Sequence, residues 1–444
     1  MTATKSLRLV ACSLLLLTLH FVNCYAQADP APKRFLIWDE RGKFGYMDET
    51  GRVVIAPQFD RAYPFAEAVA AVSVENKSGF IDAAGKQVIP FQYFTTSSFS
   101  DGVAAVSFSE GAGQQRHSSC GYIDHANNFV IKPQNKFSCT EPFHEGFAAI
   151  EIYDERVGES LASYLNKEGQ EAVAGRLSVG KPFSEGLALV EDFAKWSFVN
   201  KDGQTVIDLR PQDRSNILAD EYEPASSFSE GLAMVGITVS GSAGYSRYAF
   251  MNRKGRMVFK LRDNVIAEGD FHNGRAQVYI AMDRIVRVRV EGETFKEKED
   301  MSARGYIDST GKIVIRPRFS RVEDFSEGLA VVRVGKGIPL DYWNITPERW
   351  KVYARNEAKY YSCIDRNGHI VIQRCGDPLT SAEIAEDFQG FGRAFGRGFI
   401  DGLFFSKTHV RVAGELKTVY GYMNRAGKYV WIQPHGTKIT PGRR

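Results

Sequence analysis

The sequence lacks an excess of charge of either sign. Basic residues number 56 and acidic residues 53 among 444. Two of the basic residues, Lys5 and Arg8, lie in an N-terminal segment that we expect to be removed, which leaves 56 less two, or 54, against 53. Proteins that bind nucleic acid need clustered positive charge. The balance therefore argues against nucleic acid as a partner.

The sequence also lacks an apolar stretch of the roughly 20 residues that a membrane helix needs. The candidate stretch, residues 9–22, is too short, and it follows two basic residues and precedes a small-x-small sequence at residues 26–28. This order is typical of a secretory signal peptide. We therefore predict a signal peptide over 1–28 and a mature chain over 29–444 that has no membrane span and is periplasmic or extracellular. A lipoprotein anchored through Cys24 is the alternative.

Cysteines are few. Two of the six lie in the predicted signal, and an even number in an exported chain suggests disulfides. Three pairings are open, and short loops favour Cys120 with Cys139 and Cys363 with Cys375. Neither pair has the spacing of a zinc site, and four buried free thiols are the alternative.

Known catalytic patterns are missing as well. The sequence has no nucleophile elbow, paired-histidine zinc pattern, phosphate-binding loop or dinucleotide fingerprint. Histidines of the mature chain are scattered, so no metal site and no cofactor are predicted. Carboxylates do recur, but they are copied in nearly every repeat. A catalytic pair would be unique, so the recurrent carboxylates favour turn formation over glycoside hydrolysis.

What the sequence does contain is two motifs that recur along the mature chain. The first motif is Gly-aromatic-apolar-Asp/Asn with a second Gly three residues after the Asp, followed by a β-branched run and often a proline. Its clearest copies begin at Gly45, Gly79, Gly305 and Gly421. Weaker copies centre on Asp124, Asn166, Asn200, Asn252 and Asp365.

The second motif is Phe-Ser-Glu-Gly-Leu-Ala. It begins at Phe183, Phe228 and Phe325, with variants at Phe65, Phe99, Phe143 and Phe271 and a looser copy at Phe388. Asp-x-x-Gly and Ser-Glu-Gly are turn sequences, and the β-branched runs between them are strands that we expect proline to end.

These motifs predict an all-β fold, a tandem array of about nine three-stranded antiparallel units. The units begin near residues 35, 72, 115, 160, 194, 246, 302, 358 and 418. One unit cannot bury its own apolar face, so stability must come from stacking on its neighbours. Nine units exceed the usual number of propeller blades. A curved or superhelical array is therefore preferred, with a propeller-like ring as the alternative.

The motifs resemble the WG-repeat family, also described as KWG repeats, across most of residues 35–435. Residues 305–330 carry both motifs almost unbroken, although the name-giving tryptophan is replaced, for example by Phe44 and Arg304. The resemblance implies a repeat fold and a role in cell-surface or protein interaction, and it implies no shared catalytic residues.

Insertions gather in one type of connection late in the chain, where repeat arrays commonly bind ligands. The longest insert, residues 337–360, carries the aromatic residues proposed as a ligand surface: Tyr342, Trp343, Trp350 and Tyr353. The alternative is that they only pack the insert. We therefore expect a non-enzymatic scaffold that binds a protein or glycan of the cell envelope. The alternative is an exported enzyme that acts on polysaccharide at a site formed by the late inserts. The oligomeric state is left open.

Overall fold

The computed structural model describes residues 32–110, 117–135, 137, 142–155, 158–173, 177–192, 195–209, 221–224, 226–238, 246–290, 293–335, 338–339, 357–378, 398–412 and 415–434. The chain divides into two compact units, Met1–Pro32 and Lys33–Arg444, and everything below concerns the second. The predicted signal peptide, Cys139 and the four aromatic residues of the late insert lie outside the described residues.

Within the described residues the secondary structure is entirely β, which confirms the predicted fold class. The early strands are β1 (Phe35–Trp38), β2 (Phe44–Met47), β3 (Val53–Phe59), β4 (Arg61–Ala62), β5 (Val69–Val74), β6 (Lys77–Asp82), β7 (Gln87–Tyr93), β8 (Thr95–Thr96), β9 (Val103–Glu110), β10 (His117–Asp124) and β11 (Phe129–Gln134). The middle strands are β12 (Phe147–Asp154), β13 (Glu159–Asn166), β14 (Val179–Gly180), β15 (Ala188–Asp192), β16 (Lys195–Val199), β17 (Thr205–Asp208), β18 (Glu221–Pro224), β19 (Leu232–Thr238), β20 (Ser246–Asn252) and β21 (Met257–Lys260). The late strands are β22 (Val265–Ala267), β23 (Ala276–Val290), β24 (Glu293–Ile307), β25 (Ile313–Val322), β26 (Leu329–Gly335), β27 (Ile338–Pro339), β28 (Glu357–Asp365), β29 (Ile370–Cys375), β30 (Phe399–Ile400), β31 (Leu403–Val412), β32 (Glu415–Asn424) and β33 (Tyr429–Ile432).

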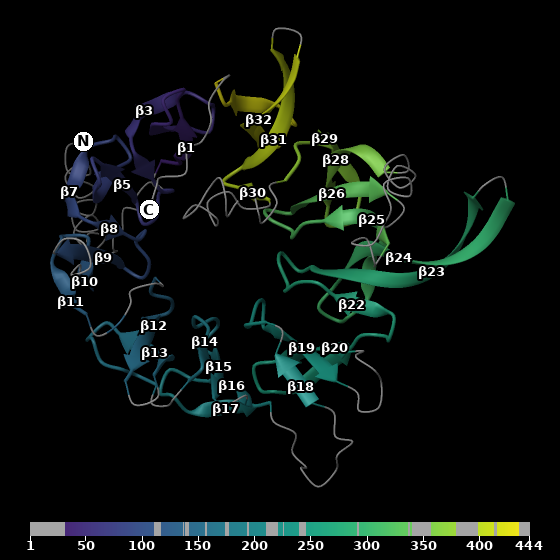
Figure 1. Ribbon diagram of the computed structural model, residues 1–444, viewed down its shortest axis with the longest axis horizontal. Coiled ribbons are helices and arrows are strands. Elements are labelled where there is room, and N and C mark those ends of the chain that lie inside the picture. The colour runs from purple at the N-terminus through teal and green to yellow at the C-terminus, as the bar shows by residue number, and fades with distance from the viewer. Residues whose placement is uncertain are drawn as a thin grey trace, which may run out of the picture. The chain divides into compact units, whose positions relative to one another are not determined.

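The strands form small antiparallel sheets that follow one another in chain order (Figure 1). Most described sheets have four strands, such as β4-β5-β6-β7 and β30-β31-β32-β33, whereas the first has three, β1-β2-β3. One larger sheet, from β22 to β29, joins two consecutive units. We number the units from one to nine; units seven and eight share the larger sheet, and unit nine holds β30–β33.

Each sheet is offset from the sequence repeat. The Leu-Ala strand of the second motif pairs with the first-motif strand that follows it, as in β5 with β6. The short strand before it, such as β4, joins the same sheet as a fourth strand. The predicted unit of three strands therefore gains a fourth, and the second-motif turn lies inside a sheet rather than between units.

The first-motif turn is as predicted. The Asp48 side chain accepts the backbone N–H groups of Thr50 and Arg52, at 3.0 and 3.1 Å. Gly51 takes the left-handed conformation at φ 88°, which glycine adopts without steric cost. The hydroxyl of Thr50 also donates to Asp48, and these hydrogen bonds to the ionised form lower the pKa of Asp48 to about 2.

The glycine that opens the first motif is required for a different reason. The pairing of β24 with β25 shifts register there, and a Cβ on Gly305 would lie 2.3 Å from the carbonyl oxygen of Ile315. Gly305 also faces Pro317, and the strand continues past that proline to Val322. Proline was expected to end this strand. It sits instead at a bulge, where its missing N–H costs no ladder hydrogen bond.

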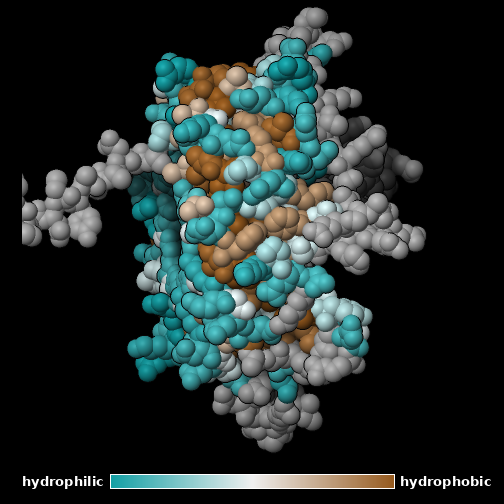
Figure 2. Space-filling model, turned by 90° about the vertical axis from the view of Figure 1, so that its left-hand side faces the viewer, coloured by the Kyte–Doolittle hydropathy of each residue, from teal (hydrophilic) through white to brown (hydrophobic). Residues whose placement is uncertain are grey.

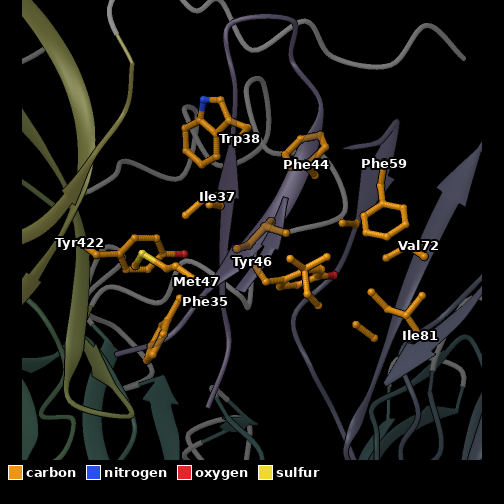
Figure 3. Packing of buried hydrophobic residues seen from close by; sticks show 14 of the residues in the cluster. Phe35, Ile37, Trp38, Phe44, Tyr46, Met47, Phe59, Val72, Ile81 and Tyr422 are labelled. Atoms are coloured by element: carbon orange, nitrogen blue, oxygen red, sulfur yellow. The ribbon is translucent and has the colours of Figure 1, made fainter. Parts of the chain in front are cut away.

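The core lies between consecutive sheets, and the last sheet packs on the first. Trp38 of β1 is 2% exposed and lies 5.1 Å from Trp431 and 5.8 Å from Phe405, ring centroid to ring centroid. Figure 3 shows Tyr422 of β32 facing Phe35 and Met47 of the first sheet. These contacts close the array of residues 33–444, which makes it propeller-like, the arrangement that was held as the alternative. We call this junction the seam.

The strand at one edge of most sheets exposes β-branched and aromatic side chains. Figure 2 shows hydrophobic residues gathered in a band on the side where β7 and β11 lie. Val88 is 43% exposed and Phe129 44%. One or two such residues per strand face solvent, two of them in β11 and in β29, while the opposite face packs against the next sheet.

Candidate binding site at the seam

Aromatic pairs join each of units one to seven to the unit that follows it. The aromatic residue of the first motif packs against the second-motif Phe of the following unit, with ring centroids 4.8–5.2 Å apart. The pairs are Tyr46–Phe65, Phe80–Phe99, Tyr122–Phe143, Tyr164–Phe183, Phe198–Phe228, Phe250–Phe271 and Tyr306–Phe325. At this spacing tilted and edge-to-face rings attract one another beyond their burial.

Tyrosine adds a hydrogen bond to this contact. The hydroxyl groups of Tyr46, Tyr164 and Tyr306 donate to the backbone carbonyl two residues before the partner Phe, at 2.6–2.7 Å. A buried hydroxyl without such an acceptor loses its hydration without compensation. The acceptor is therefore part of the contact that the tyrosine makes.

A second link runs through the recurrent carboxylates. The side chain of the second-motif Glu, or of the Asp or Asn in its place, accepts the backbone N–H of the Gly in the next unit's second motif at 2.6–3.1 Å. The links are Glu67–Gly102, Asp101–Gly146, Glu145–Gly186, Glu185–Gly231, Glu230–Gly274, Asn273–Gly328 and Glu327–Gly402. The recurrent carboxylates had been interpreted as turn formers. They do occupy turns, but their side chains join neighbouring units.

The second-motif serine makes a third link, because its hydroxyl donates to the carbonyl of the next unit's motif Phe. Ser184 reaches Phe228 and Ser229 reaches Phe271, both at 2.7 Å. The sequence Phe-Ser-Glu-Gly therefore carries one contact per residue to the neighbouring unit.

The last turn of this kind is Phe399-Ile400-Asp401-Gly402, rather than the copy expected from Phe388, which lies outside the described residues. Asp401 has φ 53° and Gly402 φ 87°, the values found in the other turns. The amide of Gly402 donates to Glu327, and Arg425 forms an ion pair with the same carboxylate at 2.7 Å. Burial alone would raise the pKa of Glu327, but the hydrogen bonds from Arg425 and Gly402 lower it.

Unit one breaks the pattern. Phe35 pairs with Met47 as Ala70 pairs with Ile81, so residues 30–33 correspond to Phe-Ser-Glu-Gly. They read Pro-Ala-Pro-Lys, without the aromatic residue and without the carboxylate. Lys33 forms an ion pair with Asp401 through its side chain, at 3.3 Å and with both groups about half exposed.

A pocket lies at this interruption. Its volume is about 100 Å³. The lining residues come from the last unit, the first strand and the second unit's motif: Arg34, Phe35, Leu36, Pro64, Phe65, Gly398, Ile400, Asp401, Leu403, Phe405 and Tyr422. The pocket thus lies between the second-motif turns of units nine and two.

Tyr422 is the first-motif aromatic of the last unit, and it lines this pocket. It is 5% exposed, and burial raises its pKa. Phe35 packs on its ring at a centroid distance of 5.6 Å, which is longer than the pairs between the other units. Among the described residues its hydroxyl finds no hydrogen-bond acceptor, unlike those of Tyr46, Tyr164 and Tyr306.

A second polar cluster lies between units seven and eight. Asp270 and Asp324 each precede a second-motif Phe, where the earlier units have Pro or Ser and the last has Gly398. Burial raises the pKa of Asp270, the charge of Asp324 adds to the rise, and one carboxylate oxygen of Asp270 has no hydrogen-bond partner among the described residues. His272 lies 3.7 Å from Asp324. Raised carboxyl pKa values occur at functional sites and at structural ones.

The residues singled out in the sequence are placed as follows. Cys363 and Cys375 form a disulfide across β28 and β29, with Cα atoms 5.7 Å apart. Cys120 is also disulfide-bonded, and its expected partner Cys139 lies outside the described residues. So do Tyr342, Trp343, Trp350 and Tyr353. In the part of the chain that the structure describes, no group of three or more His, Cys, Asp or Glu residues is placed to hold a metal ion, and no helix is long and apolar enough to cross a membrane.

Sequence reasoning missed the seam pocket. Its signal was the alignment of residues 30–33 with the second motif, which shows only once strand register is known.

A family model described as WG containing repeat matches residues 44–77, 79–110, 121–154 and 305–337. No curated protein matches the chain. Among solved structures, the chain is similar to the crystal structure of the eukaryotic initiation factor, with a TM-score of 0.50 and 8% identity over 91% of this chain and 97% of that chain. At this identity the likeness shows the fold alone. The β-propeller domain of the Trilobed protease from Pyrococcus furiosus matches with a TM-score of 0.28 and 8% identity, over 54% of this chain and 88% of that domain, and supports no argument.

Proposed function

Because this chain is a WG-repeat protein whose units are joined by one repeated contact, we propose that it is a non-enzymatic scaffold that binds a partner where that contact is unfilled. The seam pocket carries the proposal. It exposes part of an aromatic interface that is occupied at the seven junctions between units one and eight. An open apolar pocket with a few polar groups is the usual form of a binding site.

The place of action that we propose is the cell envelope or the exterior, and the partner is a protein or glycan found there. The support is the pattern of residues 1–28, with its basic start, short apolar stretch and small-x-small end. Mass spectrometry of the protein recovered from the periplasm or medium should find Asp29 at the N-terminus. A lipidated Cys24, or a protein confined to the cytoplasm, would contradict this part of the proposal.

Binding is tested by capture. The mature chain, immobilised, is incubated with envelope protein and glycan fractions beside the variant Ile400→Trp, which places a larger side chain at the mouth of the seam pocket. Ile400 is 42% exposed, so the substitution should leave the fold intact. The matched control is Val258→Trp on β21, an exposed valine far along the chain from the seam.

We expect one reproducible partner for the wild-type chain and for Val258→Trp. No reproducible partner in any fraction would contradict the scaffold function. Cleavage of a glycan by the mature chain would favour the alternative, an exported enzyme that acts on polysaccharide. Asp270 and Asp324 would then be the first residues to replace.

A further inference from the structure

We propose that the long β-hairpin of unit seven binds a linear acidic polysaccharide along one of its two faces. The hairpin consists of β23 and β24, which pair without interruption from Ala276 opposite Ile307 to Val290 opposite Glu293. Figure 1 shows it extending well beyond the neighbouring sheets. It shares no residue with the seam pocket, so the inference goes beyond the proposed function.

The fold does not need the outer part of this hairpin. In unit two the equivalent strands, β5 and β6, end at Val74 opposite Lys77, which corresponds to Ile280 opposite Ala303. Each strand of the long hairpin has 15 residues, of which five match unit two, so 15 less five, or ten, extend beyond it. We call residues 281–290 and 293–302 the arm. Among the described strands outside the hairpin, β27 alone pairs with the arm, at its base. A two-stranded ribbon is marginally stable by itself and costs entropy to order, so a functional reason is expected.

One face of the arm carries four basic residues. Alternate residues of a strand lie on the same face of a sheet, and residues directly opposite in an antiparallel pair share that face. The register therefore places six residues of the outer arm on one face: Ile285, Arg287, Arg289, Thr294, Lys296 and Lys298. Four of the six are basic and none is acidic. We call these six residues the cationic face.

Two of these cations lie directly opposite each other. Arg287 pairs with Lys296, and like charges at opposite positions destabilise a hairpin. A negatively charged group bound between them replaces this repulsion with attraction. Toward the base of the arm the same face continues with Asp283 opposite Asp300, which repel an anion. The anion site is therefore confined to the outer part of the arm.

The dimensions of the cationic face favour a single extended chain over a folded partner. Its five-residue span on each strand is about 14 Å long, and the two strands lie about 4.8 Å apart. The face thus offers on the order of 200 Å², far below the roughly 800 Å² per partner of a standard protein–protein interface. Cations two residues apart on one strand are about 7 Å apart, so regularly spaced anionic groups of a polymer can meet them in series.

The residues of the two faces distinguish a polysaccharide from other polyanions. Bilayers are bound by cations together with apolar residues, but Val288 and Phe295 lie on the opposite face with Glu293 and Glu297, which an anionic bilayer repels. Single-stranded nucleic acid is held on aromatic rings, and the cationic face has none. Clusters of basic residues alone are typical of sites for heparin-like polysaccharides.

The probe is polygalacturonate, a linear polymer of uronic acid, labelled for fluorescence anisotropy and titrated with the mature chain. Dextran, an uncharged polysaccharide, is the matched ligand. The test variant Arg287→Gln with Lys296→Gln removes the facing cations. Its control, Arg284→Gln with Lys260→Gln, removes the same charge from the opposite face of the arm and from the exposed end of β21.

We expect the wild-type chain to bind polygalacturonate and not dextran. The test variant should bind at least about tenfold more weakly and the control variant within about twofold of wild type. Raising the salt concentration from about 0.05 to about 0.5 M should weaken binding at least about tenfold, because salt screens exposed charges. Ile400→Trp at the seam pocket should leave the affinity unchanged.

Lys296→Glu separates loss of binding from loss of folding. The substitution places a carboxylate opposite Arg287, so the cross-strand pair becomes attractive. We expect polygalacturonate binding to be lost while hydrogen-exchange protection of the arm rises. Binding that survives this substitution would overturn the proposal, because the anion would not be held between the two facing positions.

Other results would also overturn it. Equal affinity of the wild-type chain and the Arg287→Gln, Lys296→Gln variant would place the polysaccharide elsewhere on the molecule. Vesicles of phosphatidylcholine and phosphatidylglycerol in equal parts that bind the arm more tightly than polygalacturonate would identify a bilayer as the partner. Tighter binding of oligothymidylate would identify nucleic acid, and tighter binding of polyglutamate would identify an acidic protein segment.

Discussion

At the scale of single residues, the second-motif Glu is held in a conformation that its backbone disfavours. Glu185 and Glu327 have φ of 53° and 50°, and the equivalent residues of the other units are alike. A non-glycine residue there costs of the order of 1 kcal/mol. Glycine would remove that cost but also the carboxylate that accepts the next unit's N–H. The side chain is kept because it joins two units.

Asp270 provides a test of buried charge at the same scale. Burial is the main cause that raises the pKa of Asp270 in the folded state. In the unfolded chain an aspartate has a pKa of about 3.9. As pH rises above that value, the unfolded chain releases its proton more readily than the folded one, so stability is lost. Asp270→Asn cannot ionise and should raise the melting temperature by about 2 °C at pH 7 and by much less at pH 3.5.

Differential scanning calorimetry at both pH values measures this difference. Asp202→Asn is the control, since Asp202 is an exposed turn residue in unit five, away from Asp270, and it should give no gain. A stabilisation by Asp270→Asn that is equal at both pH values would show that charge burial is not its cause.

At the scale of one strand pair, the glycine that opens the first motif is required by close approach. A Cβ on Gly305 would lie 2.3 Å from the Ile315 carbonyl oxygen. Gly305→Ala must therefore push β24 and β25 apart, at a cost of about 1–3 kcal/mol. Urea unfolding measures it. Gly269→Ala, whose nearest atom would be 3.5 Å away, should change stability by less than about 0.5 kcal/mol, and equal effects of the two would refute the argument.

The disulfide between Cys363 and Cys375 ties β28 to β29 in one sheet. It closes a loop with a sequence separation of 12, which is worth roughly 3 kcal/mol in the chain-entropy model. Reduction should therefore lower hydrogen-exchange protection in units eight and nine more than in unit six. Peptide mapping without reductant that finds both thiols free would contradict the bond itself.

The elements could largely be read from the sequence, because each turn has local causes. Asp48 and Gly51 predict the turn between them, and the β-branched runs predict strands. The boundary of each sheet could not be read. Whether the Leu-Ala strand pairs with the unit before it or after it is decided by inter-strand hydrogen bonds, which leave no local pattern. The role of Pro317 was misjudged because a bulge depends on the facing Gly305.

The candidate site was out of reach of the sequence for a related reason. The seam joins Phe35 to Tyr422, which are separated by almost the whole chain. Repeat sequences predict contacts between neighbours, but they do not say whether the last unit reaches the first. The pocket exists only because the last unit packs against the first. The aromatic insert that had been proposed as the ligand surface stays a prediction.

At the scale of the whole molecule, the contacts that close the array should couple the stability of the first sheet to that of the last. Trp38 is 2% exposed and contacts Phe405, Tyr420 and Trp431. Trp38→Ala should cost about 3–5 kcal/mol. Hydrogen exchange should show that protection falls in β1–β3 and in β31–β33 at once, although these strands lie at opposite ends of the sequence.

The control for closure is Trp196→Ala, which removes the same side chain from a partly buried site in unit five. Its effect should be smaller and confined to units five and six. If Trp38→Ala lowers protection in the first sheet only, the two ends are not coupled.

The prolines at the bulges affect whether one molecule can associate with another through the edges of its sheets. In the described sheets, β3, β7 and β11 are edge strands, and they contain Pro57, Pro90 and Pro133. An open edge with exposed valines would otherwise recruit a strand from another molecule and start a fibre. A residue that cannot donate a hydrogen bond, set in a kinked stretch, interrupts that template. The same short sequence that lets each sheet pack on the next thus keeps one molecule from growing onto another.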